Sequence, residues 1–238
     1  MIFITSYWGN LEEGSTMSRF TRLSLLALIA AAWILTYPPP ASAQSCPHVE
    51  VVFARGTDEP PGVGEVGQRF VDSLRHKISG VGVYAVDYPA SMDFGGSTIT
   101  GVTDAGHHIQ YMTHNCPGTR IILGGYSQGA AVAGFVTSAI VPAGIDVGDL
   151  QPMNPNIASH VAAVVLFGTP SDDFLGMLGQ PPLVIGPLYA DKTTQLCIDG
   201  DPVCSPGGSL VGGDWAAHSG YQDGGKVDDG ATFAAWRI

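Results

Sequence analysis

A serine stands between two glycines in the pentapeptide Gly-Tyr-Ser-Gln-Gly, at residues 125–129. The apolar run 121–123 precedes it and the small residues 130–133 follow it, a pattern typical of a strand, a sharp turn and a helix. In this context the Ser127 hydroxyl is lifted out of the sheet. Gly125 and Gly129 are the small neighbours that the strained turn needs, and the alanines that follow let the helix pack close to the sheet. The amide of Gln128 then lies at a helix N-terminus, where it favours negative charge. Because 32 glycines make chance matches common, an ordinary turn is the alternative interpretation.

Apolar runs predict an alternation of strands and helices along the chain. The predicted strands cover residues 49–54, 81–86, 120–126, 161–167 and 193–197. Helical spacing of apolar residues predicts helices over 63–78, 102–115 and 227–236, and one more after Ser127, with a polar loop over 91–101. Strands that are apolar on both faces and alternate with helices indicate an α/β fold with a five-stranded parallel sheet flanked by helices. Only about 25 residues separate the last two strands, which leaves no room for a lid domain.

The first 43 residues are expected to lie outside the folded domain. Arg19 and Arg22 precede the apolar run 23–35, and Ala-Ser-Ala at 41–43 offers a small-residue cleavage site, so residues 17–43 are predicted to be a secretory signal peptide. Residues 1–16 then form an upstream extension, and 44–238 form one domain. A retained membrane anchor is the alternative, although the apolar run is short for a membrane span. We therefore expect a secreted protein, either free or associated with the cell envelope.

Net charge excludes some partners. The chain has a formal charge of −11, and loss of residues 1–43 removes two arginines and two glutamates and leaves that value unchanged. Such a surface repels nucleic acid and does not favour adsorption to anionic lipid.

Four cysteines remain in the predicted domain: Cys46, Cys116, Cys197 and Cys204. In an exported protein an even number predicts two disulfides, and three pairings are possible. Local closure of Cys197 with Cys204, which leaves Cys46 with Cys116, is the pairing we favour. A zinc site is the rival interpretation, but no pair has C-x₂-C spacing and no histidines accompany the cysteines at H-x₃₋₅-H spacing.

A reactive serine needs a base and an acid that orients the base. In this fold the three follow the chain order Ser, acid, His. Of seven histidines only His160 and His218 follow Ser127, and His160 precedes a strand at the end away from the site. His218 is therefore the predicted base. Asp201, inside the short Cys197–Cys204 loop, is the predicted acid, with Asp199 as the alternative.

The oxyanion of the reaction needs two donors. One is the amide of Gln128, and the other is expected from the loop after the first strand, where Thr57 stands. Arg55 in the same loop is expected to brace the backbone rather than to touch substrate.

Two stretches of this chain resemble the signatures of the cutinase family. Residues 117–129, which contain Ser127, resemble the serine signature, and residues 197–204 followed by His218 resemble the second signature, C-x₃-D-x-[IV]-C…H. Residues 53–57 resemble the oxyanion loop of the family. Pro206 and a longer segment between Cys204 and His218 depart from the family pattern. The resemblance covers residues 46–238, and the chain is similar to the cutinase-like esterases that actinobacteria secrete.

This resemblance implies a secreted serine esterase with the α/β-hydrolase fold. It implies Ser127, Asp201 and His218 as the catalytic triad, an oxyanion hole at Thr57 and Gln128, and the bridges Cys46–Cys116 and Cys197–Cys204. We expect a monomer that cleaves small or lipid esters with short to medium acyl chains and needs no cofactor or metal. A phospholipase or thioesterase, an acyltransferase, and a secreted binding protein without activity are the alternative functions.

Overall fold

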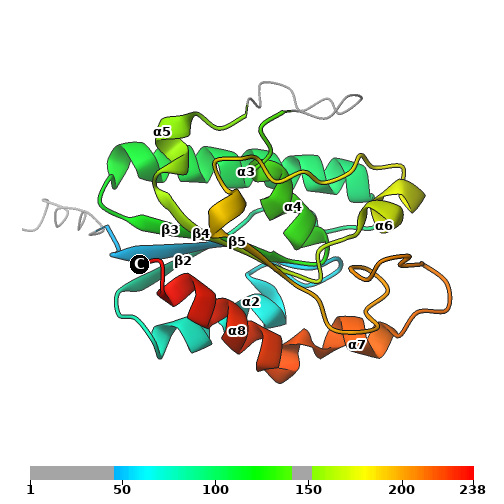
Figure 1. Ribbon diagram of the computed structural model, residues 1–238. Coiled ribbons are helices and arrows are strands. Elements are labelled where there is room, and N and C mark those ends of the chain that lie inside the picture. Colours follow the sequence, from blue (N-terminus) through cyan, green and yellow to red (C-terminus); the bar gives the residue numbers. More distant parts are fainter. Residues whose placement is uncertain (1–45, 141–151) are drawn as a thin grey trace, which may run out of the picture. The chain divides into compact units, whose positions relative to one another are not determined.

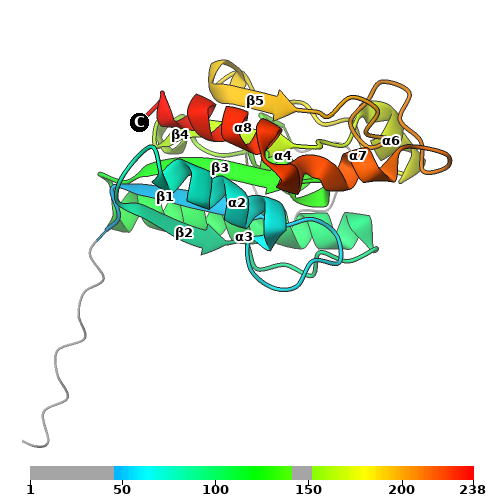
Figure 2. The ribbon, with the colours of Figure 1, turned by 90° about the horizontal axis from the view of Figure 1, so that it is seen from below.

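Five parallel strands form one sheet (Figure 1), and their order across the sheet is β2-β1-β3-β4-β5 (Figure 2). Their bounds are β1 Val49–Ala54, β2 Val81–Ala85, β3 Arg120–Tyr126, β4 Val161–Phe167 and β5 Thr193–Leu196. The computed structural model describes residues 46–140 and 152–238, so the predicted extension 1–16 and signal peptide 17–43 lie outside the described residues. The predicted α/β class and five-stranded parallel sheet are confirmed, and each observed strand begins at the predicted residue.

Helices cover both faces of the sheet, which explains why β1 and β4 are buried along their whole length. Helices α3 and α4 pack on one face, and α2 and α8 pack on the other (Figures 1 and 2). The long helices are α2 Gly64–Arg75, α3 Phe94–Asn115, α4 Gln128–Val136 and α8 Gly225–Ala235. The short helices are α5 Pro155–Ala158, α6 Asp172–Met177 and α7 Trp215–Ser219, with 3₁₀ turns η1 Ala190–Lys192 and η2 Gly220–Asp223.

Helix α3 begins earlier than predicted, and the loop expected over 91–101 is wrong. The side chain of Asp93 accepts a hydrogen bond from the amide of Gly96 and caps the helix. Ser97, Thr98 and Gly101 are buried on the first turns of α3. A helix whose buried face is made of small polar residues and glycine shows no apolar periodicity, and for this reason the pattern of the sequence did not reveal it.

The carboxyl ends of the central strands meet at one edge of the sheet. Ala54 pairs with Gly125, and Tyr126 pairs with Phe167, so the loops that follow β1, β3 and β4 leave the sheet side by side. Helix α7 lies beyond the same edge (Figure 2). His160, by contrast, directly precedes β4 and therefore stands at the other edge. In open parallel sheets the binding crevice lies at the carboxyl edge.

Two disulfides close parts of this domain: Cys46 with Cys116, and Cys197 with Cys204. The first joins the segment before β1 to the segment before β3. The second closes a short loop directly after β5.

Within the described residues, no helix has the length and apolar character that crossing a membrane requires.

Candidate active site

Ser127 lies in a strained turn between β3 and α4. Its φ of 55° is positive, a conformation that is uncommon for a residue with a side chain and that clusters at functional sites. Neither of the flanking glycines has room for a side chain. A Cβ on Gly125 would fall on the backbone carbonyl of Gly129, and a Cβ on Gly129 would fall on the carbonyl oxygen of Ala54. The glycines therefore serve the turn itself, and the alternative of an ordinary strand-to-helix turn does not describe this geometry.

His218 connects Ser127 to a buried carboxylate. Its Nε2 lies 2.9 Å from the hydroxyl oxygen of Ser127, and its Nδ1 lies 2.9 Å from Oδ1 and 3.0 Å from Oδ2 of Asp201. His218 is 8% exposed and Asp201 is fully buried. With the proton on Nδ1, the ring donates to Asp201 and Nε2 is free to accept the proton of Ser127. The structure thus brings together the three residues that the sequence assigned to catalysis.

Asp201 is held as an anion by several donors. Burial alone would raise the pKa of its carboxyl, but hydrogen bonds from His218, the amide of Val203 and the hydroxyl of Tyr221, together with attraction to the His218 ring, hold the pKa below its ordinary value. The alternative acid, Asp199, is exposed. Asp201 also lies between the two cysteines of the Cys197–Cys204 disulfide, which restricts the loop that carries it.

Two tyrosines that the sequence reasoning missed lie next to His218 and Asp201. Tyr126 donates a hydrogen bond of 2.6 Å to the backbone carbonyl of His218, and its ring stacks on the imidazole with centroids 5.2 Å apart. Tyr221 donates to Oδ2 of Asp201 at 2.8 Å and accepts from the amide of Ile198 at 3.0 Å. Tyr126 adjoins the serine, and Tyr221 follows His218 by about one helical turn, so proximity along the chain was the available signal.

The loop after β1 carries Thr57 to the same edge. Arg55 is 4% exposed and donates to the carbonyl oxygens of Glu59 at 2.7 Å and Tyr88 at 2.8 Å, which agrees with the expected bracing role. The carboxylate of Glu59 accepts from the amides of Gly56 at 2.5 Å and Glu65 at 2.8 Å. Glu59 therefore ties the loop to the first turn of α2, a contact that the sequence reasoning missed.

Gln128 follows the serine at the first position of α4. Its side chain is fully buried; it accepts from the hydroxyl of Ser97 at 3.2 Å and donates to the carbonyl of Ser91 at 2.9 Å. The Ser97 hydroxyl in turn accepts from the amide of Ser91 at 3.1 Å. These bonds attach the residue after the serine to the start of α3. The side chain is thus occupied within the protein, and the backbone amide is the part of Gln128 suited to stabilise negative charge.

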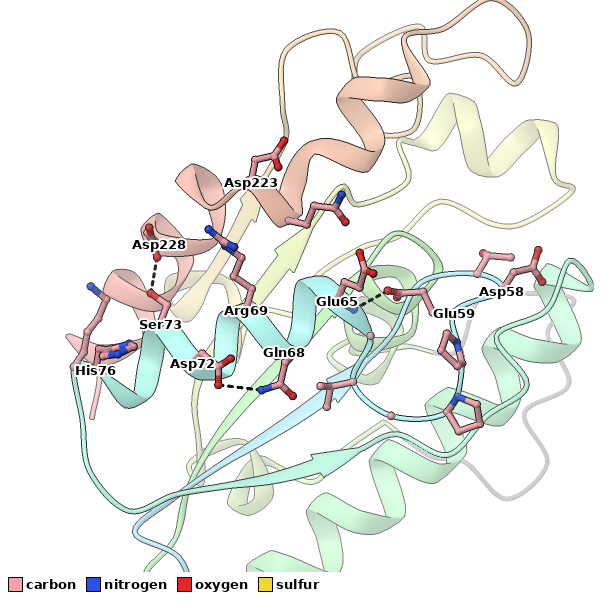
Figure 3. A pocket seen from close by; sticks show the side chains of 18 residues that line it. Asp58, Glu59, Glu65, Gln68, Arg69, Asp72, Ser73, His76, Asp223 and Asp228 are labelled. Atoms are coloured by element: carbon pink, nitrogen blue, oxygen red, sulfur yellow. Dashed lines mark hydrogen bonds between the residues drawn. The ribbon is translucent and has the colours of Figure 1, made fainter.

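A groove of about 1450 Å³ runs along α2, beside the Thr57 loop (Figure 3). Charged and polar side chains line it, including Glu65, Arg69 and Asp223, and none of Ser127, Asp201 or His218 does. A hydrogen bond from Ser73 to Asp228 crosses from α2 to α8 at 2.6 Å. The groove therefore reaches the loop of Thr57 and Glu59, which line it, but not the three residues joined by hydrogen bonds at Ser127.

Known proteins are similar to this chain over most of its length. The Cutinase family model matches residues 45–238. "Probable carboxylesterase Culp5" of Mycobacterium tuberculosis is 52% identical over 177 residues, 74% of this chain and 98% of the relative. "Phospholipase Culp4" of the same organism is 46% identical over 223 residues, 92% of each chain.

Solved structures match the same fold. The catalytic core domain of an acetyl xylan esterase from Trichoderma reesei has a TM-score of 0.68 at 23% identity and covers 82% of this chain and 100% of its own. A Trichoderma reesei cutinase in complex with a phosphonate inhibitor has a TM-score of 0.58 at 28% identity and covers 92% of this chain and 91% of its own.

Proposed function

Since this chain belongs to the cutinase family and is a carboxylic ester hydrolase, we propose that it cleaves its ester through an acyl-enzyme on Ser127. The observation that carries the proposal is the continuous hydrogen-bond chain from Asp201 through His218 to Ser127, with 2.9 Å at each step. Asp201 holds the tautomer of His218, and His218 is the base for Ser127.

The first half of the reaction acylates the serine. His218 Nε2 takes the proton of Ser127 as Oγ attacks the ester carbonyl, and the carbonyl oxygen becomes an oxyanion. The amides of Thr57 and Gln128 are the proposed donors to that oxyanion, supported by the helix N-terminus at Gln128 and by the bracing of the Thr57 loop. The tetrahedral intermediate then collapses, the bond to the alcohol oxygen breaks, and His218 gives its proton to the leaving alcohol.

The second half releases the acid. Water attacks the acyl carbonyl, His218 takes a proton from that water, and the bond from the acyl carbon to Ser127 Oγ breaks as the proton returns to the serine. The products are one carboxylic acid and one alcohol, and the serine is regenerated.

We propose acyl chains of short to medium length as substrates. The segment between β4 and β5 contains only the six-residue helix α6 and the turn η1, so this segment, which the structure describes in full, supplies no helical lid. A chain-length series of esters of one alcohol is expected to peak below about twelve carbons, and a maximum above that length would contradict the proposal.

Replacement of the nucleophile tests the mechanism. Ser127→Ala is expected to lose hydrolysis of p-nitrophenyl butyrate by about 10⁴-fold or more and to lose labelling by a fluorophosphonate probe. Ser159→Ala removes an exposed hydroxyl at the opposite edge of the sheet. This variant should keep both the hydrolysis of p-nitrophenyl butyrate and the labelling by the probe. Intact-mass measurement of one covalent adduct on the parent protein, and its absence in Ser127→Ala, completes the test. Full activity in Ser127→Ala would exclude the acyl-enzyme.

A phospholipase is the second candidate, because the relative that covers 92% of this chain carries that name. The formal charge of −11 disfavours an anionic lipid surface. Hydrolysis of a zwitterionic phosphatidylcholine of short acyl chain, compared with a triacylglycerol of the same chain, separates the two candidates.

We also propose that the chain is exported and that residues 17–43 are removed. Two disulfides in the domain support an oxidising compartment. The mass of the protein recovered from culture medium tests this, with a mature N-terminus at Gln44 as the expected result.

A further inference from the structure

Three aromatic rings surround the His218 imidazole, and Trp215 is the most exposed of them. Tyr221 is 1% exposed and Tyr126 is partly buried, whereas Trp215 is 44% exposed. The indole lies edge-to-face with the imidazole at 88°, with centroids 5.8 Å apart. Trp215 begins the short helix α7, and His218 lies three residues later, which places both on one face of that helix.

The other sides of the imidazole are already occupied. Nδ1 faces Asp201 and Nε2 faces Ser127. Tyr126 stacks on the ring, and Cε1 lies close to Gly168, where an added Cβ would be 3.2 Å from it. The exposed part of Trp215 is therefore an apolar surface beside the base that is open to an incoming molecule.

The chemistry of the leaving group determines what meets this surface. His218 must give its proton to the alcohol oxygen, so that oxygen comes within hydrogen-bond distance of Nε2 in the acylation step. The carbon group attached to the oxygen then lies next to the imidazole and its exposed aromatic neighbour. Leu210 and Val211, in the loop before α7, are also exposed, at 43% and 85%. They add further apolar surface to the segment that leads into Trp215.

We propose that Trp215 forms the wall of the leaving-alcohol subsite and makes the enzyme selective for esters of aromatic or bulky apolar alcohols over esters of small alcohols. This inference rests on the proposed acyl-enzyme function. An indole contacts an aromatic ring by stacking or edge-to-face packing, a contact that an ethyl group does not make to the same extent. Trp215 thus acts on the alcohol part of the ester, and the acyl part is bound elsewhere in the site.

The test varies the alcohol and keeps the acyl group constant. Benzyl butyrate and ethyl butyrate release alcohols of similar acidity, so a difference in kcat/KM reports binding of the alcohol and not its ease of departure. The wild type is expected to prefer the benzyl ester. In Trp215→Ala, kcat/KM for the benzyl ester should fall about 10-fold and that for the ethyl ester less than about 2-fold. Trp215→Phe, which keeps an aromatic ring, should retain most of the preference for the benzyl ester.

Matched controls separate specificity from positioning. Trp236→Ala removes an 85% exposed tryptophan next to the end of α8, away from the site. This variant should have the same kcat/KM as the wild type for both the benzyl and the ethyl ester. The relative kcat/KM values for ethyl acetate, butyrate and octanoate should be the same in Trp215→Ala as in the wild type. The rate of fluorophosphonate labelling, together with thermal unfolding, shows whether each variant is folded with a working Ser127–His218 pair.

Two results would overturn the assignment. An equal loss for the benzyl and ethyl esters would make Trp215 a positioning residue for His218 only, and a changed acyl-chain preference would place it in the acyl subsite. Either result leaves the acyl-enzyme proposal intact, because that proposal fails only if Ser127→Ala hydrolyses these esters.

Discussion

The hydroxyl of Tyr221 lies 2.8 Å from Oδ2 of Asp201, to which it donates a hydrogen bond within the buried core of the site. Burial raises the pKa of the Tyr221 hydroxyl, and the carboxylate beside it raises the pKa further, so the phenol stays protonated and remains a donor. Tyr221 therefore helps to hold the carboxylate that orients His218, and it does so without contact to the reacting ester.

Tyr221→Phe removes this donor and keeps the aromatic packing. Hydrogen bonds to charged groups contribute about 1.5–3 kcal/mol, so we expect kcat to fall about 10-fold with KM nearly unchanged. Steady-state kinetics with p-nitrophenyl butyrate measures both. Tyr111→Phe, on the exposed side of α3, is the matched control and should behave as the wild type. A Tyr221→Phe enzyme with unchanged kcat would show that His218 and Val203 suffice to hold Asp201.

The same variant should change how stability depends on pH. The pKa of Asp201 is lowered in the folded protein, so its contribution to stability is present above the unfolded pKa of about 3.9 and is lost as the pH falls through the folded pKa. Loss of the Tyr221 donor raises the folded pKa toward the unfolded one and reduces that contribution. The difference in free energy of unfolding between wild type and Tyr221→Phe should be larger at pH 7 than at pH 3. Urea unfolding at both pH values measures it, and a difference independent of pH would contradict this account.

Glu59→Gln tests the brace of the proposed oxyanion loop. The carboxylate of Glu59 accepts from two amides, of Gly56 and Glu65, and a glutamine has only one acceptor oxygen and presents an NH₂ group to the other amide. We expect kcat to fall about 10-fold or more, because an unpaired amide and a displaced loop weaken oxyanion binding by about 1.4 kcal/mol or more. KM should change little. Glu65→Gln, which alters an exposed side chain and keeps the Glu65 amide, is the control, and equal activities of the two variants would refute the brace.

Gly129→Ala tests the space around the serine turn. The added Cβ would meet the backbone carbonyl of Ala54, which cannot move aside as a flexible side chain does. We expect a loss of about 3 kcal/mol or more in the free energy of unfolding, or no folded protein. Gly106→Ala, in the interior of α3 with nothing near the new methyl group, should instead stabilise by about 0.5–1 kcal/mol. Chemical denaturation of both variants gives the comparison, and a normally stable Gly129→Ala protein would mean that the turn opens easily.

Removal of either disulfide should lower stability, but only removal of the Cys197–Cys204 bridge should also lower kcat. The Cys46–Cys116 bridge closes 70 residues and the Cys197–Cys204 bridge closes seven, so chain entropy predicts losses of about 4 and about 2–3 kcal/mol on their removal. Because Asp201 lies within the short loop, the double variant Cys197→Ala with Cys204→Ala should also lose kcat at a temperature where it remains folded. Cys46→Ala with Cys116→Ala should retain kcat under the same conditions. Equal effects on kcat would show that the short bridge does not position Asp201.

Several features of the fold were predictable because they depend on short stretches of chain. Strands β1, β3 and β4 are apolar on both faces, and their bounds were predicted to the residue. The start of α3 was not predicted, because its buried face consists of small polar residues and glycine and shows no apolar period. The contacts of Glu59 and Tyr221 were also missed, since a carboxylate in a loop and a tyrosine in a turn have many ordinary roles on a protein surface.

The sequence by itself determined the parallel α/β sheet, the glycine-flanked serine and the order of serine, acid and histidine, because residue type and periodicity along the chain carry that information. Only the tertiary structure decided which groups meet. Ser127 and His218 are 91 residues apart, and Asp201 rather than Asp199 is turned into the core. Such meetings depend on loop paths set by packing and hydrogen bonds between distant segments. For the same reason, the edge-to-face packing of the exposed Trp215 indole against the His218 ring became evident only when the chain was folded.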